Sequence, residues 1–401
     1  MRNNKYVIFQ ITPASTGGIG RLTRDISDIL PKEMFEMHIA YAGGKIIEQG
    51  RDFMFGTKYD VMYHGLMTRL TDKMGMYSKS ATKQLLDYME ESKVDLVHLH
   101  NLHGYYINIP MLFEYLAQKN IPVIWTLHEC WAMTGHCTHF SYVGCDKWKS
   151  HCSKCPQTSS YPKAYVDNSQ FNHNMKRKYF TMLRDLTVVT PSEWLRDLVR
   201  QSYLAKYNSY CFHNGIDLST FRMKSPEEIV KLTDKKVILG LASTFNDRKG
   251  FSDFISLSRI LPEEYQIVMV GIKPYQLNKL PKNIIGITHT ENVEQLVDIY
   301  NQAYLFLNLT YEDNFPTTNL EAQACGTSVL TYRTGGSVES VTQDTGYIVE
   351  QGDLENVRKI VLQHSKTEDT IKACVINAKE YDRKLTFQKY VNLYKKKLLL
   401  Q

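Results

Sequence analysis

The sequence predicts an α/β protein of two domains, each built on a parallel sheet that helices cover on both faces. Short apolar runs rich in β-branched residues alternate with segments of helical period along the chain. These runs are apolar throughout, as in strands that are buried on both faces. The alternation restarts at Lys236, and 401 residues exceed what one compact core usually holds.

Each half of the chain supplies its own strands and helices. Strands are predicted in the first half at 6–10, 37–41, 95–100, 123–128 and 186–190. In the second half they are predicted at 237–242, 266–270, 284–287, 305–309, 328–332 and 347–349. Amphipathic helices are predicted around 19–30, 193–202, 293–300 (capped by Asn292 or Glu291) and 385–398. We expect domains at 1–207 and 208–381, with 208–222 as the linker.

Composition narrows the class of protein. Hydrophobic residues make up 43% and charged residues 22%, which are globular values and argue against disorder. A net charge of +6 suits a polyphosphate ligand, an anionic membrane surface or nucleic acid. No dense basic block with interleaved aromatics is present, so we expect no nucleic-acid partner. The four apolar residues Tyr6–Phe9 are too few for a signal-peptide core, and a cytoplasmic location is expected.

Two loops have the composition of phosphate-binding turns. Gly17-Gly18-Ile19-Gly20-Arg21 follows the first strand and opens a helix, whose free N–H groups attract an anion. The spacing is not GxGxxG, which argues against a nicotinamide dinucleotide. After the first strand of the second half, Arg248 and Lys249 precede a helix, where the helix dipole disfavours cations unless an anion binds. The alternative for both loops is an ordinary surface turn.

An acidic motif is the most specific evidence in the sequence for a ligand-binding site. Glu312 and Asp313 end a strand, and Glu321 follows Asp313 by eight residues. Carboxylates of this kind accept hydrogen bonds from sugar and ribose hydroxyls, and the amides around Phe315–Thr318 would face a ligand at a helix start. A capped helix with a solvated acidic start is the alternative.

Five motifs together resemble glycosyltransferase family 4, whose members are retaining enzymes with the GT-B fold. They are the glycine turn at 17–18, Thr190-Pro191-Ser192, Asn214-Gly215-Ile216-Asp217, Arg248-Lys249-Gly250 and the acidic element at 313–321. Leu127-His128-Glu129 and the cysteines after it resemble the branch of bacterial capsule, exopolysaccharide and colanic-acid-type synthesis. The resemblance implies two Rossmann-like domains facing a cleft, with a terminal helix at 382–401 packed back on the first domain.

The resemblance also implies roles for individual residues. Asp313 or its neighbour Glu312 would contact the transferred sugar, and His128 would lie near the reacting centre; these three are the expected catalytic residues. The expected donor-binding residues are Gly17, Gly18, Arg248, Lys249, Gly271, Asn314, Phe315, Pro316, Thr317 and Glu321. One stretch departs from the family, because Ser243-Thr244-Phe245 stands where many relatives carry Gly-Arg-Leu. Either Arg248 supplies the missing cation or phosphate is bound more weakly.

The expected reaction moves a sugar from a UDP-sugar, or a GDP-sugar, to a saccharide or polyprenyl-linked saccharide. No Asp-x-Asp metal motif is present, so we expect catalysis without a metal or other cofactor, through front-face attack assisted by the leaving phosphate. The alternative functions are those of another GT-B enzyme, such as a nucleotide-sugar 2-epimerase, and of a binding protein that is stabilised by a structural zinc ion.

A cysteine cluster offers a metal site. Cys137, Cys145, Cys152 and Cys155 lie within nineteen residues and end in Cys-x-x-Cys. Four thiolates would close a structural zinc tetrahedron; the alternatives are free thiols in a packed loop, or two disulfides if the protein were exported. His98 and His100 alternate along a strand, and we expect strand-end packing or contact with the acceptor for them rather than a metal site.

Two segments suggest peripheral contact with the inner face of a membrane. Lys395-Lys396-Lys397 and Met67–Met76 are most simply surface helix, and contact with anionic lipid is the alternative for each.

Overall fold

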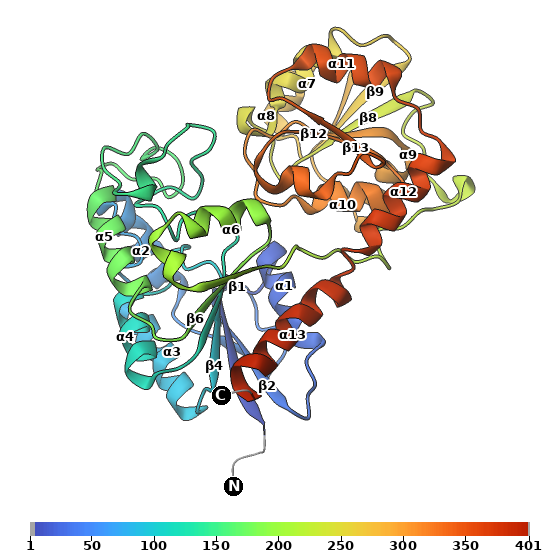
Figure 1. Ribbon diagram of the computed structural model, residues 1–401. Coiled ribbons are helices and arrows are strands. Elements are labelled where there is room, and N and C mark those ends of the chain that lie inside the picture. Colours follow the sequence, from blue (N-terminus) through green and yellow to red (C-terminus); the bar gives the residue numbers. More distant parts are fainter. Residues whose placement is uncertain (1–4, 400–401) are drawn as a thin grey trace. The chain divides into compact units, whose positions relative to one another are not determined.

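The chain folds into two compact units, which a computed structural model describes over residues 5–399 (Figure 1). The first unit comprises the chain up to Phe212 together with the stretch from Phe387 onward. The second unit is His213–Thr386.

A seven-stranded parallel sheet forms the centre of the first unit. Its order is β3-β2-β1-β4-β5-β6-β7, so the order reverses between β1 and β4. The strands are β1 (Tyr6–Ala14), β2 (Phe35–Gly43), β3 (Asp52–Met54), β4 (Leu96–Leu99), β5 (Val123–Thr126), β6 (Leu186–Thr190) and β7 (Asn208–Cys211).

Helices bury both faces of this sheet (Figure 1). They are α1 (Gly17–Asp28), α2 (Lys58–Thr71), α3 (Lys79–Glu91), α4 (Ile109–Lys119), α5 (Ser169–Phe180), α6 (Glu193–Arg200) and the terminal α13 (Arg383–Leu399). Helices α3 to α6 share one core with Val97, Leu99 and Trp125. Helices α1 and α13 share the core of the other face, and the Tyr394 hydroxyl lies 2.6 Å from His98 Nδ1. The terminal helix is thereby fixed to the middle of the first sheet.

The second unit has a six-stranded parallel sheet of order β10-β9-β8-β11-β12-β13. The strands are β8 (Lys236–Leu241), β9 (Tyr265–Val270), β10 (Ile284–Ile287), β11 (Ala303–Asn308), β12 (Val329–Tyr332) and β13 (Gly346–Val349). Its helices are α7 (Phe251–Ser258), α8 (Pro274–Leu277), α9 (Val293–Gln302), α10 (Thr317–Ala324), α11 (Leu354–Gln363) and α12 (Glu368–Lys379). Helices α9, α10 and α12 pack on one face, and α7 and α11 on the other.

The expected strands of both halves are all present, and two further strands escaped prediction. β3 has three residues, and β7, with the sequence Asn-Ser-Tyr-Cys, begins where the linker was expected. Both are edge strands with no fully buried residue, so neither shows an apolar run or a clean alternation. The linker therefore begins after Cys211.

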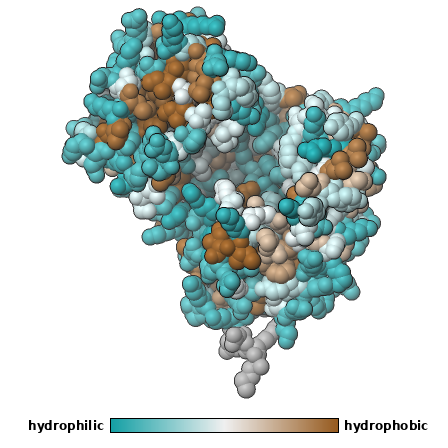
Figure 2. Space-filling view, turned by 180° about the vertical axis from the view of Figure 1, so that it is seen from behind, coloured by the Kyte–Doolittle hydropathy of each residue, from teal (hydrophilic) through white to brown (hydrophobic). Residues whose placement is uncertain are grey.

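On the face that Figure 2 shows, hydrophilic residues surround separate patches of hydrophobic residues. Within residues 5–399, no helix has both the length and the apolar character needed to cross a bilayer.

Candidate functional site

A pocket of about 240 Å³ opens in the second unit where the strand order reverses. The chain leaves β8 and β11 at the same edge of the sheet, because the two strands are parallel neighbours. Ligands of doubly wound α/β sheets bind at such a reversal. Polar groups that line the pocket include Ser243, Lys249, Asp313, Thr317 and Thr318.

The predicted cations and carboxylates meet at this edge. Lys249 Nζ lies 2.5 Å from Asp313 Oδ2, although 64 positions separate the two residues. Arg248 Nη1 lies 4.0 Å from Glu312 Oε2, and Glu312 is buried. A short 3-10 turn, η4 (Asp247–Lys249), presents both cations, and the Asn246 side chain caps it by accepting from the Lys249 N–H. The turn thus places two cations, each paired with a carboxylate, at this strand end.

The start of α10 adds hydrogen-bond donors to the pocket. Its N-cap residue, Pro316, has no side chain that could cap the helix, and its first turn has no acidic residue. Pro316 and Thr317 line the pocket. Asn314 and Phe315 are buried beside it, and the Phe315 ring packs 4.7 Å from the ring of His213. Phe315 therefore anchors the loop in the core, while the helix amides behind it remain directed at the pocket edge.

Glu321 is held by two hydroxyl groups. Its Oε1 accepts from Thr317 Oγ1 at 3.1 Å, and its Oε2 accepts from the Tyr300 hydroxyl at 3.0 Å. Burial, followed by the charge of Glu321, raises the pKa of Tyr300 well above its ordinary value, so Tyr300 stays a proton donor. Because Thr317 lines the pocket, these bonds fix the carboxylate next to it.

Gly271 shapes one wall of the pocket. It follows β9 with a φ of +99°, and a Cβ there would lie 1.7 Å from the carbonyl oxygen of Ala242, a pocket residue. Only glycine permits this approach of β9 to the end of β8. The residue predicted as donor-binding thus acts on the described pocket through the backbone.

The glycine turn of the first unit lies at the corresponding reversal, between β1 and β4. Gly17 has a φ of +80°, and a Cβ at Gly17 or Gly18 would meet nothing within 4 Å. A Cβ at Gly20 would lie 2.5 Å from the Ser15 carbonyl carbon. Gly20 is therefore needed for packing, whereas Gly17 and Gly18 leave space above the start of α1.

His128 belongs to a hydrogen-bonded chain that includes the buried side chains of His100 and Gln10. The Gln10 amide nitrogen donates to the Thr23 carbonyl at 2.7 Å, so Gln10 Oε1 faces His100 and accepts from Nε2 at 2.9 Å. His100 Nδ1 then carries the lone pair and accepts from His128 Nε2 at 3.2 Å. This order fixes the neutral tautomer of His128, with the proton on Nε2. Strand-end packing, as predicted, is the role of His98 and His100.

Acid is expected to destabilise the first unit through these histidines. Burial lowers the pKa of His128 to about 4, that of His98 to about 3, and that of His100 well below its ordinary value. Since the unfolded chain binds these protons near pH 6.5 and the folded chain does not, stability is present above that pH and falls as the pH drops below it. We expect a loss on the order of a few kcal/mol between pH 7 and pH 5.

Tryptophan fluorescence isolates this effect, because all four tryptophans lie in the first unit (Trp125, Trp131, Trp148 and Trp194). Urea titrations at several pH values should show the decline. His128→Gln should reduce its slope, and His289→Gln, at an exposed site in the second unit, should leave it unchanged. A midpoint that does not move between pH 7 and pH 5 would contradict the buried neutral state.

The four predicted cysteine ligands gather around one small cavity of about 20 Å³, which is room for a single ion or water. Gly135 N–H donates to Cys152 Sγ at 3.1 Å. The amine of Lys176, bonded to the carbonyls of Trp131 and Thr134, lies in the same region, and burial lowers its pKa to about 7. Within residues 5–399 the sulfur atoms form no group of three within 4.8 Å of one another. A tetrahedral ion would have to draw them inward.

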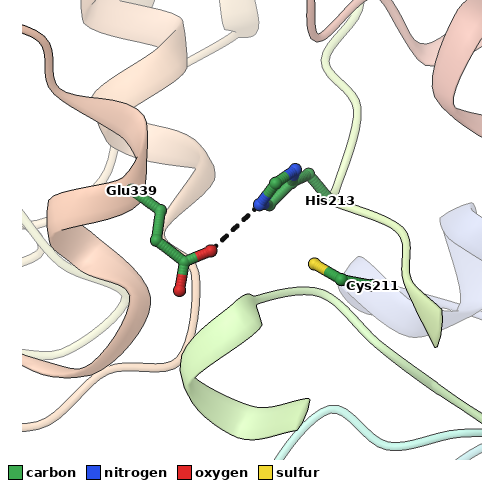
Figure 3. A group of neighbouring side chains, drawn as sticks. All are labelled: Cys211, His213 and Glu339. Carbon is green, nitrogen blue, oxygen red and sulfur yellow. Dashed lines mark hydrogen bonds and ion pairs between the residues drawn. The ribbon is translucent and has the colours of Figure 1, made fainter. Parts of the chain in front are cut away.

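Several contacts were not predicted from the sequence. Tyr300 was assigned only to an apolar helix face, and its hydroxyl bond to Glu321 gave no sequence signal. Figure 3 shows a second case in the same unit, where His213 Nε2 lies 3.0 Å from Glu339 Oε2. Cys211, also drawn there, is the last residue of β7 in the first unit. His213 supports Phe315, so this pair stabilises the loop in front of α10.

Two family descriptions match the chain. Residues 16–220, just over half of the chain, match "Glycosyltransferase Family 4", and residues 223–381 match "Glycosyl transferases group 1". The first range begins just after β1 and includes the glycine turn, and the second includes β8 and β11, the strands of the reversal at the pocket.

Two curated relatives are bacterial glycosyltransferases. One, from Escherichia coli, is assigned by name to colanic acid biosynthesis and is 23% identical over 269 residues, 65% of each chain. The other, a capsular polysaccharide biosynthesis glycosyltransferase of Staphylococcus aureus, is 24% identical over 203 residues, 45% of this chain and 53% of the relative. The chain thus matches less than two thirds of the length of either relative.

A solved structure shares the whole fold. HepE of Anabaena, crystallised in complex with UDP-glucose, has a TM-score of 0.66 at 14% identity and covers 97% of this chain and 99% of its own. Both units therefore follow the GT-B architecture that the sequence predicted.

Proposed function

Because the chain belongs to glycosyltransferase family 4, we propose that it moves a sugar from a nucleoside-diphosphate sugar to a saccharide or polyprenyl-linked saccharide, with retention of configuration. A UDP-sugar is the favoured donor and a GDP-sugar the alternative. The pathway would be bacterial surface polysaccharide synthesis, as the names of the two relatives suggest. The observation that carries the proposal is the convergence of Lys249, Asp313 and the start of α10 on one pocket.

The leaving diphosphate needs positive charge and hydrogen-bond donors. Lys249 would supply the charge, and the uncapped amides at the start of α10 would supply the donors. Arg248 is a second cation at the same turn. No catalytic metal is needed in this scheme, because fixed groups of the chain neutralise the leaving oxygen atoms.

The carboxylates would bind the rest of the donor. Glu321, oriented by Tyr300 and Thr317, would accept from the ribose hydroxyls. Asp313 is placed for the transferred sugar, since it lines the pocket, and Glu312 is buried against Arg248. The structure thus favours Asp313 over Glu312 as the sugar contact.

In the chemical step, the acceptor oxygen would attack the anomeric carbon of the donor sugar from the same face from which the diphosphate departs. The anomeric carbon–phosphate oxygen bond breaks while the bond to the acceptor oxygen forms, and the leaving phosphate takes the acceptor proton. His128, neutral and fixed in one tautomer by His100, would be the residue of the first unit near the reacting centre, as the resemblance implies.

A donor screen tests the proposal. UDP- and GDP-sugars should raise the melting temperature, and the stabilising donor should then label a saccharide or lipid-linked saccharide with the anomer of the donor. Conversion of the donor with no acceptor would favour an epimerase instead. An unchanged cellular function of Glu321→Ala would favour a binding protein.

A structural zinc ion at Cys137, Cys145, Cys152 and Cys155 is a further part of the proposal. The shared cavity and the N–H bond from Gly135 to the sulfur of Cys152 fit thiolate ligands. The ion would hold together a loop with little secondary structure of its own.

Metal analysis of the purified protein should find about one zinc per chain. Cys155→Ser should lose the metal and lower the melting temperature, because one ligand of four is removed. Cys211→Ser, outside the cluster, is the matched control and should keep it. Metal-free protein that is as stable as the untreated protein would refute the zinc site.

A further inference from the structure

Helix α2 has its apolar side on the outside. The residues that it buries are His64, Gly65 and Thr68, which are polar or small. Its seven exposed residues are all large and apolar or cationic: Lys58, Tyr59, Met62, Tyr63, Leu66, Arg69 and Leu70. A surface helix of a globular protein normally buries its apolar stripe. Folding of this unit therefore leaves the stripe exposed, which marks an interaction surface.

Polar contacts hold α2 in this orientation. His64 Nδ1 lies 2.8 Å from Ser78 Oγ, and His64 Nε2 accepts from the Gly75 N–H at 3.1 Å. Gly65 packs close to the Tyr105 ring. Rotating the helix to bury Leu66 would break both bonds of His64 and expose a buried imidazole. The outward stripe is thus fixed by the fold.

A neighbouring segment enlarges the apolar surface. The Tyr165 N–H donates to the Arg69 carbonyl at 2.8 Å, which places residues 161–171 beside the end of α2. Tyr165 is 68% exposed, and Tyr161, Val166 and Phe171 are exposed as well. We call α2 and residues 161–171 together the outer face.

Cations flank the apolar side chains of the outer face. Lys58 Nζ lies 5.3 Å from the Tyr59 ring centroid, Lys73 Nζ lies 4.7 Å from that of Phe171, and Lys163 Nζ lies 5.9 Å from that of Tyr165. Lysines with aromatic neighbours can bury their stems and keep their ammonium groups at a polar boundary.

The carboxylates of the outer face are engaged locally. Asp60 closes the capping box of α2 with Thr57, and Asp167 accepts from the N–H groups of Cys155 and Ser169. Lys58, Arg69 and Lys163 outnumber these two carboxylates, so the outer face has a small excess of positive charge.

We propose that the outer face docks on a membrane surface that contains anionic lipid, with α2 lying in the plane of the headgroups. Tyrosine, leucine and methionine would enter the boundary of the acyl chains, and the lysines and Arg69 would meet the phosphates. Tyrosine, methionine and arginine also occur at protein interfaces, but lysine is depleted there, and lysines placed beside aromatic rings fit the polar boundary of a bilayer, which favours lipid over a protein partner. The proposal does not rest on the donor site, although a lipid-linked acceptor would be presented at the same surface.

The segments that suggested lipid contact in the sequence are placed differently. In Met67–Met76 the helix ends at Thr71 and Met74 is buried. Lys396 contacts the Tyr210 hydroxyl, and Lys397 is paired with Asp185. The stripe therefore overlaps the predicted segment at Arg69 and Leu70 and extends back to Lys58.

Flotation of the full chain with vesicles tests the proposal. The chain should float with vesicles of equal parts phosphatidylglycerol and phosphatidylcholine, and less with phosphatidylcholine alone. Leu66→Ser/Leu70→Ser should lower the partition coefficient by about tenfold or more, because two side chains that would be buried in the membrane are lost. The matched control is Ile376→Ser/Leu385→Ser, at apolar sites of the second unit that are at least as exposed, and should bind as the unchanged chain does.

Two variants that remove positive charges separate the electrostatic contribution to binding from the apolar contribution. Lys58→Gln/Arg69→Gln should weaken binding to the phosphatidylglycerol vesicles, and Lys83→Gln/Lys372→Gln should not. Equal flotation of the leucine variant and the unchanged chain would overturn the proposal. It would also be overturned if neither protein floated and size-exclusion chromatography showed a dimer of the unchanged chain and a monomer of the leucine variant. Donor binding measured on the same samples keeps the two proposals apart: loss of flotation with donor binding intact overturns only this one.

Discussion

Replacing Lys249 with alanine is expected to lower kcat/KM for sugar transfer by about 100-fold or more. The ammonium group is the cation that lines the pocket, 2.5 Å from Asp313. Removing one fixed group that stabilises charge in a transition state typically costs two to three orders of magnitude. Steady-state transfer with the stabilising donor measures the effect.

Two further variants test whether the loss of activity comes from the charge at position 249. Lys249→Arg keeps the charge and should retain more activity than the alanine variant. Lys282→Ala removes an exposed lysine of the same unit and should be silent. If Lys249→Ala transfers sugar at the unchanged rate while remaining folded, the diphosphate is bound elsewhere.

Replacing Glu321 with alanine should weaken donor binding by about 10- to 100-fold and lower activity with it. Hydrogen bonds to a charged group contribute about 1.5–3 kcal/mol, which corresponds to that range of affinity. The change also leaves the Tyr300 hydroxyl without its carboxylate acceptor. Donor affinity and the melting temperature are measured on the same preparation.

Tyr300→Phe distinguishes binding from positioning. It keeps the carboxylate and removes one of the two hydroxyls that orient it. We expect a smaller loss of affinity, about tenfold or less, with the pH dependence of binding unchanged. Donor affinity of Glu321→Ala equal to that of the unchanged chain would remove the ribose assignment.

The fold could be predicted because the strands that carry it are buried on both faces. Runs such as Val237–Leu241 and Leu186–Thr190 have no polar face and stand between helical periods. The edge strands β3 and β7 could not be found, since their exposed positions leave no apolar signature. Edge strands depend on pairing with a neighbour, which local sequence does not encode.

The candidate site was predictable where a charged residue stands at the end of a predicted strand. Lys249 and Asp313 each stood out as a charge at a strand end, and strand order brings them together. The supporting contacts were not predictable, because Tyr300 and His213 read as ordinary apolar or polar residues of their own segments. Their roles arise from packing between elements far apart in sequence.

Titration calorimetry of UDP and GDP against the full chain tests the central claim most directly. The account predicts that one of the two nucleotides binds once per chain, and that Lys249→Ala weakens this binding by tenfold or more while Lys282→Ala does not. Equal affinity in all three proteins, or no binding of either nucleotide to the unchanged chain, would contradict it.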